Sequence, residues 1–214
     1  MLDISYGTGE DSRNRILQQV TEWKKANPAF KVIDVGGTAV GWSASIADVV
    51  VDINSPDSDN NINMDICKSS GWDKLLELVE REGMFDYAIC THTLEDIYNP
   101  FSALDYFPKI ARAGIITMPS MTAELSNGES PNWLGYIHHR WVFDQVDGEM
   151  IVAPKLTFLE YLVSGNIVRD LANEEIRYDW TDSIPYRHFM NNYLGPDMWT
   201  VVNEYQQVIT DRLQ

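Results

Sequence analysis

Short apolar runs along the chain alternate with longer stretches in which apolar residues recur at helical spacing. Branched aliphatic residues predominate at positions 31–35 and 48–52; glycines follow the first run, and the second ends in an acid. Continuous apolar runs of this length are typical of strands that are covered on both faces, as in a parallel sheet. Phe85–Thr91 and Ile115–Met118 have the same character, so strands are predicted over all four segments.

Stretches with helical periodicity lie before, between and after these runs. In residues 11–27 the apolar positions Ile16, Leu17, Val20 and Trp23 fall on one helical face. The predicted helices cover residues 11–27, 71–82, 100–111 and 198–212. Short polar side chains are expected to cap three of these helices, namely Asp11 or Ser12, Ser69 or Ser70, and Asp197.

The order of these elements predicts the fold class. Strands that alternate with helices imply an α/β fold with a doubly wound, mostly parallel sheet. We expect a single domain over residues 1–214, with a core over 1–120 and an insertion and C-terminal extension over 121–214. A strand over Glu149–Pro154 and a strand or short helix over 155–163 could extend the sheet as its antiparallel end.

The segment between the first two strands is short. Only 11 residues, Gly37 to Ala47, separate the glycine turn from the second strand, and a crossover that includes a full helix usually needs about a dozen or more. We therefore expect the helix to be reduced to about one turn. A dinucleotide site holds its pyrophosphate at the N-terminus of that helix, so the spacing argues against an NAD-linked enzyme.

Composition narrows the classes of partner. The 214 residues carry a formal net charge of −16, which argues against nucleic acid because a phosphate backbone attracts clustered Lys and Arg. No apolar run is long enough to span a membrane, and the first 15 residues lack the apolar centre of a signal peptide. Cys67 and Cys90 have no CxxC spacing and are expected to be buried thiols. We expect a cytoplasmic protein that binds a small molecule.

Polar residues collect where the predicted strands end. Asp34 leads into Gly36-Gly37, where glycine allows a sharp turn and lets backbone N–H groups approach a ligand. Asp52 ends the second strand and is placed to accept hydrogen bonds from two ribose hydroxyls. Ligands bind such sheets outside the carboxyl ends of the strands, so these residues predict a nucleoside pocket.

A further acid follows in Met64-Asp65-Ile66. An acid between two apolar side chains could clamp an adenine ring, with the exocyclic amine donating to Asp65. An ordinary loop aspartate would give the same pattern, and the residues alone leave both interpretations open.

Residues 31–120 resemble the class I S-adenosylmethionine-dependent methyltransferases. VIDVGG is similar to the first motif of that family, VVVDI to the acidic end of its second strand, and NMDI to its adenine-contacting segment. FDYAICTHTLEDIYNP resembles the family's stretch with FD, HxLEH and P, and ALDYFPKIARAGIITMPS resembles the helix and strand that follow it. The chain differs in having Thr38 at the second motif glycine, a short first helix, and LEDI where LEHL is commoner.

This resemblance implies a Rossmann-like methyltransferase fold, S-adenosyl-L-methionine (SAM) as the cofactor, and methyl transfer to a small-molecule acceptor such as a sugar or an acidic metabolite. A catalytically inactive binding or assembly protein on the same scaffold is the alternative. The implied cofactor contacts are Asp34, Gly36 and Gly37 at the methionine part, the Thr91-His92 backbone at the sulfonium side, Asp52 at the ribose, and Asp65 and Ile66 at the adenine.

Reactive side chains are concentrated in NWLGYIHHRW, which ends at Trp141. His138 or His139 could act as a general base on an acceptor hydroxyl, because the pKa of histidine lies near working pH. Arg140 could hold a carboxylate or phosphate of the acceptor, and Trp141 could stack on a ring. Alternatively, the two histidines only pack and cap the insertion.

His92 and Glu124 are further acceptor-side candidates, His92 as a base and Glu124 in substrate binding. The two could form a metal site with one histidine of the pair, but adjacent histidines point in different directions and no HxH or HxxxH spacing is present. No metal is therefore expected. Residues 165–196 are rich in aromatic residues and turns and are expected to form a lid or a homodimer surface. His188 is expected to be structural or exposed.

Overall fold

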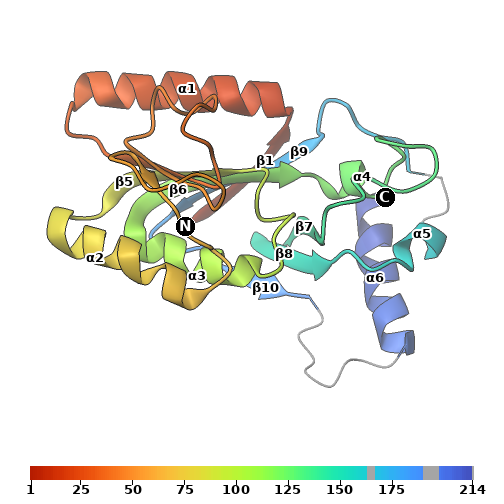
Figure 1. The fold of residues 1–214 in the computed structure, drawn as a ribbon. Helices are drawn as coiled ribbons and strands as arrows, with labels where there is room; N and C mark the ends of the chain where they lie inside the picture. Colours follow the sequence, from red (N-terminus) through yellow and green to blue (C-terminus); the bar gives the residue numbers. More distant parts are fainter. Residues whose placement is uncertain (163–166, 190–197, 214) are drawn as a thin grey trace.

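A large sheet forms the centre of the molecule in the computed structural model, which describes residues 1–162, 167–189 and 198–213 (Figure 1). Within these residues the strands of the sheet follow the order β1 (Leu2–Gly7), β9 (Glu175–Thr181), β6 (Ala111–Pro119), β5 (Phe85–Thr91), β2 (Val32–Val35), β3 (Val49–Val51) and β4 (Asn61–Ile62). The strands from β2 to β6 are parallel, and β9 is antiparallel to both β6 and β1. The predicted α/β fold with a mostly parallel sheet is confirmed.

Helices cover both faces of this sheet, as the apolar strands require. α1 (Gly9–Ala26) covers one face, where Val20 packs among buried strand residues. α2 (Asp73–Glu82) and α3 (Pro100–Ile110) cover the other face, and Phe107 of α3 is fully buried there (Figure 1). The segment between β2 and β3 contains turns and no helix, which confirms the shortened crossover.

The caps of two helices differ from prediction. Thr8 caps α1, because its Oγ1 accepts the backbone N–H of Asp11 at 3.2 Å. Ser12 is buried, and its hydroxyl donates to Glu175 instead of capping. α2 follows a short 3₁₀ turn, η1 (Ser69–Gly71), and has no side-chain cap. The expected caps at Asp11, Ser12, Ser69 and Ser70 are therefore wrong.

The antiparallel end of the sheet was also predicted incorrectly. β8 (Glu149–Pro154) pairs with β7 (Trp141–Val146) and β10 (Tyr186–His188) in a separate sheet. The end of the large sheet is formed by β9 and β1, neither of which was predicted. β9 lies within residues 165–196 and buries Trp180 in the main core, so this part of the segment is neither a lid nor a dimer surface.

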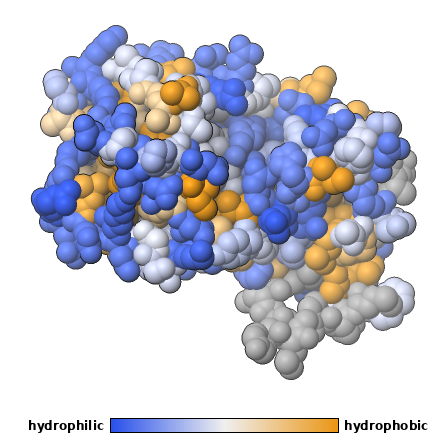
Figure 2. Space-filling view, in the orientation of Figure 1, coloured by the Kyte–Doolittle hydropathy of each residue, from blue (hydrophilic) through white to orange (hydrophobic). Residues whose placement is uncertain are grey.

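A second, smaller core lies against the other face of the small sheet. It is enclosed by α4 (Met121–Glu124), α5 (Leu159–Leu162) and α6 (Met198–Leu213), and apolar side chains gather over α6 on the surface in Figure 2. Tyr205 of α6 is buried there, whereas Trp199 is exposed.

Two further expectations concern the cap of α6 and the absence of a membrane-spanning helix. The expected cap, Asp197, lies outside the described residues. None of the helices within the described ranges combines the length and apolar content that crossing a membrane requires.

Candidate functional site

The order of the strands reverses between β2 and β5. From β2 the chain moves outward through β3 to β4 and then returns to β5 on the other side of β2. In open α/β sheets, ligands bind outside the carboxyl ends of the strands at such a reversal. The segments that leave β2 and β5 at this point contain Gly36 and His92.

An open cleft of about 400 Å³ lies at this reversal, a volume typical of small-molecule sites. A larger hollow, of about 770 Å³, lies at the amino ends of the strands and contains none of the candidate residues. The candidates that line the cleft are Gly36, Asp52, Asp65, Ile66, His92 and Arg140. The candidates outside its lining are Asp34, Gly37, Thr91, Glu124, His138, His139 and Trp141.

Asp34 lies outside the cleft lining, beside the glycine turn that follows β2. Its side chain is buried and accepts a hydrogen bond from the Ser43 hydroxyl. A Cβ added to Gly37 would lie 1.9 Å from the Asp34 carboxylate, and one added to Gly36 would lie 2.4 Å from the Thr93 side chain. The two glycines therefore make room for Asp34 and Thr93. Burial raises the pKa of Asp34 to about 6, although the bond from Ser43 acts to lower it.

The two acids of the cleft already accept hydrogen bonds from their own loops. Asp52 Oδ1 accepts the backbone N–H of Asn54 at 2.9 Å. Asp65 Oδ1 accepts the backbone N–H of Cys67 at 3.0 Å, and Asp65 Oδ2 lies 2.9 Å from Lys68 Nζ. The bond from Lys68 lowers the pKa of Asp65. A carboxylate has about four acceptor positions, so both acids keep capacity for a ligand.

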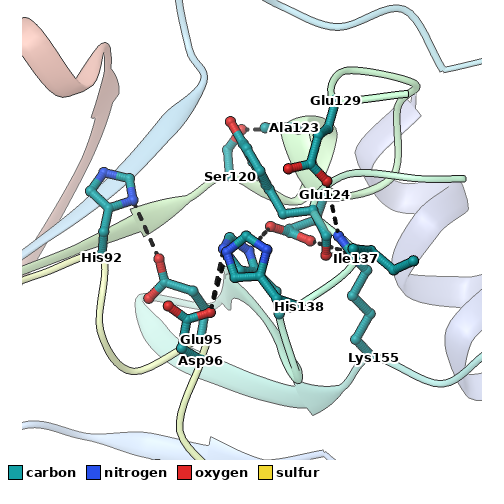
Figure 3. Close-up of polar contacts among 12 residues, drawn as sticks. His92, Glu95, Asp96, Ser120, Ala123, Glu124, Glu129, Ile137, His138 and Lys155 are labelled. Carbon is teal, nitrogen blue, oxygen red and sulfur yellow. Dashed lines mark hydrogen bonds and ion pairs between the residues drawn. The ribbon is translucent and has the colours of Figure 1, made fainter. Parts of the chain in front are cut away.

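His92 stands between two buried glutamates. His92 Nε2 lies 2.7 Å from Glu175 Oε2, and His92 Nδ1 lies 3.3 Å from Glu95 Oε1 (Figure 3 shows the Glu95 pair). Burial acts to lower the pKa of His92, but the bonds to Glu175 and Glu95 outweigh it and raise the pKa to about 9. A histidine that stays protonated at neutral pH cannot accept a proton. The structure therefore argues against His92 as the base.

This pairing predicts a pH dependence of stability. The pKa of His92 in the folded state, about 9, exceeds its ordinary value of 6.5. The stabilisation is therefore fully present below about pH 6.5 and is lost as the pH rises through about 9. We expect urea unfolding to show a loss of about 1 kcal/mol between pH 6 and pH 10 that His92→Gln lacks. Parallel pH profiles for the two proteins would contradict the prediction.

A second polar cluster forms where the histidine pair meets the segment that follows β5. His139 Nδ1 bonds to Glu124 Oε1; 6% of the His139 side chain and 1% of the Glu124 side chain are exposed. The other Glu124 oxygen lies 2.7 Å from Lys155 Nζ. Because the carboxylate accepts a hydrogen bond from Nδ1–H, the lone pair of the neutral ring lies on Nε2 of His139. His139 Nε2 faces Asp96 Oδ1 at 3.7 Å.

His138 approaches the same carboxylate. His138 Nε2 also lies 3.7 Å from Asp96 Oδ1, and the two imidazole rings are 4.5 Å apart. The expectation that the adjacent histidines diverge is therefore wrong. A turn explains the geometry, because the backbone N–H of His139 bonds to the carbonyl of Tyr136 at 3.2 Å and curls both rings toward Asp96.

Comparisons with known proteins do not assign a family. No family model and no curated protein matches the chain. Among solved structures, a cyclopropane-fatty-acyl-phospholipid synthase-like protein from Lactobacillus casei ATCC 334 is similar over 82% of this chain and 94% of its own, with 11% identity and a TM-score of 0.38. A likeness at this level carries no argument about function.

Trp141 has a structural role that the sequence did not indicate. Its indole N–H donates to the carbonyl of Ile97 at 2.8 Å, and its ring packs edge-on against Phe101. The backbone N–H groups of Arg140 and Trp141 both reach the carbonyl of Glu95, at 2.7 and 3.3 Å. These contacts fix the histidine segment to the segment after β5.

Sequence reasoning missed three charged residues of the site. Asp96 had a signal, because it occupies the position where LEDI departs from LEHL. Lys155, just after β8, and Glu175 in β9 had none, because they reach Glu124 and His92 from segments distant in the chain.

Proposed function

We propose that the chain is a SAM-dependent methyltransferase for a small acceptor that carries a hydroxyl and an anionic group. One observation carries this proposal: a single cleft at the strand reversal gathers Asp52, Asp65 and His92 from three separate segments. These are residues that the motif resemblance assigns to the ribose, the adenine and the sulfonium side.

The residues present fit an adenosine-bearing cofactor. Asp52 and Asp65 both retain acceptor positions for hydroxyl and amine groups. Met64 and Ile66 flank Asp65, line the cleft and are largely buried, which suits a planar ring between them. When bound, SAM supplies a methyl group on a sulfonium that a nucleophile can attack.

The side chains of the protein would align the acceptor with the methyl group and remove the proton of its hydroxyl. Arg140 lines the cleft, and no acid among the described residues forms an ion pair with it. Its guanidinium can therefore bind an anionic group of the acceptor. The His138–His139 pair lies beside Arg140 and near Asp96 of the cleft lining, where it can act on an acceptor hydroxyl.

Calorimetry with SAM and S-adenosylhomocysteine tests the proposal. We expect micromolar binding that weakens by about 10–100-fold in Asp52→Ala, because hydrogen bonds to a charged group contribute about 1.5–3 kcal/mol. Asp59→Ala, an exposed acid of the same loop, is the matched control and should bind as the wild type does. Absence of binding in the wild type would leave the inactive binding or assembly protein as the better interpretation.

A further inference from the structure

We propose that Asp96, His138 and His139 bind a divalent first-row transition-metal ion at the edge of the cleft. One ligand atom from each residue is available, and the three atoms all lie within 4.8 Å of one another. Each histidine Nε2 is 3.7 Å from Asp96 Oδ1. Two ligands bound about 2.0–2.2 Å from one ion at a tetrahedral angle are about 3.4 Å apart. Small side-chain shifts therefore bring these atoms to metal-binding distances.

The spacing within the cluster differs from that of a hydrogen-bonded network. A charge-assisted hydrogen bond between imidazole and carboxylate is about 2.7–2.9 Å long, and both Asp96 contacts exceed that length. Among the described residues, no hydrogen bond is formed by the Asp96 carboxylate or by either Nε2 atom. Three converging donor atoms thus remain without a closer partner, which is the arrangement expected around an ion.

Glu124 supplies an independent observation. Metal-binding histidines usually donate their second ring N–H to a carboxylate, which fixes the ring and raises the basicity of the ligand nitrogen. Glu124 is buried and accepts a hydrogen bond from His139 Nδ1. Its other oxygen is held by Lys155 at 2.7 Å (Figure 3). The hydrogen bond to Glu124 leaves His139 Nε2 directed at Asp96. The cluster therefore has three metal-ligand candidates, and Glu124 orients one of them, His139.

The ligand types indicate the class of metal and its surroundings. Two imidazoles and one carboxylate favour zinc, iron, cobalt or nickel over magnesium or calcium, which prefer oxygen. Three protein ligands leave at least one position for water or for an acceptor oxygen. Asp96 and Arg140 both line the cleft, so that position is next to the acceptor side. A role in lowering the pKa of an acceptor hydroxyl rests on the proposed function; the metal site itself does not.

Metal titration of the full-length, tag-free chain tests the site. We expect calorimetry to show one Zn²⁺ per chain, and Co²⁺ to give visible absorption bands that Zn²⁺ displaces. His138→Ala and Asp96→Ala should abolish both signals at concentrations that saturate the wild type. Glu124→Gln should weaken binding by about 10–100-fold, because it acts through His139.

The controls separate this site from other metal contacts and from the cofactor cleft. His188→Ala removes a histidine that packs on Phe101 and Trp141 and supplies no ligand atom to the cluster, and it should leave Zn²⁺ binding unchanged. Asp52→Ala should also bind Zn²⁺ normally even if it no longer binds SAM. Because 58% of the His138 side chain is exposed, His138→Ala should fold. The proposal is overturned if the wild type does not bind Zn²⁺ or if His138→Ala binds it equally well. If the wild type still binds SAM in that case, the proposed function stands and His139 acts as a free base.

Discussion

Glu175→Gln is expected to lower the free energy of unfolding by about 3–5 kcal/mol, because it breaks a buried charge pair from one side. Only 2% of the Glu175 side chain is exposed, and it lies 3.6 Å from Arg177 Nε and 2.7 Å from His92 Nε2. It also accepts the Ser12 hydroxyl of α1. The neutral amide has nearly the same shape, so the loss should report charge rather than packing. Chemical denaturation at pH 7 measures it.

The neighbouring residue provides a matched control. Glu174 lies 2.6 Å from Arg169, but 30% of its side chain is exposed, and exposed pairs contribute about 0–1 kcal/mol. Glu174→Gln should therefore cost less than about 1 kcal/mol. A second measurement follows from the same contact: the pKa of His92 should fall from about 9 in Glu175→Gln, because one of the two glutamates that raise it is lost. Equal losses in the two glutamate variants would refute the prediction.

The burial of Glu175 also shows why some strands could be predicted from the sequence and others could not. β2, β3 and β5 are rich in apolar residues on both faces, so their pattern alone identifies them. β9 contains Glu175 and Arg177, which are buried in the fold but suggest a solvent-exposed segment in the sequence. β1 is partly exposed at the edge of the sheet and lacks an apolar run. Strands whose polar residues are satisfied only by distant partners cannot be identified from local periodicity.

The candidate site was predictable to a similar extent. Asp52 could be placed at the cleft because it follows the end of a predicted parallel strand, and such ends meet at one edge. Asp65 was assigned to the adenine by its apolar neighbours and the family resemblance, not by a strand end, because β4, the strand that precedes it, was not predicted. Asp34 also ends a strand, but its side chain turns inward to Ser43. The paired histidines could be identified as reactive, yet their common direction depends on the turn at Tyr136. Residue type and position relative to a strand end therefore predicted which residues lie near the cleft. The direction in which each side chain points could be seen only in the tertiary structure.

His139→Ala is expected to reduce methyl transfer by about 10²–10⁴-fold, the range for loss of a group that handles the acceptor proton. The loss is expected whether His139 acts as a free base or as a metal ligand, since its Nε2 is the atom involved in both cases. Conversion of SAM to S-adenosylhomocysteine, followed with a panel of sugars, sugar phosphates and hydroxy acids, provides the measurement. His188→Ala, which removes a histidine packed on Phe101, should retain the wild-type rate.

A substitution at Glu124 distinguishes a catalytic from a packing cause of the rate loss in His139→Ala. As a positioning residue that holds the His139 ring, Glu124→Gln should lower kcat with little change in the KM of the acceptor. It should add no further loss to His139→Ala, because two residues that act as one unit are not additive. Both variants must also retain SAM affinity, since neither residue lines the cleft. Additive losses, or a rate for His139→Ala equal to that of His188→Ala, would remove the buried His139–Glu124 pair from the reaction.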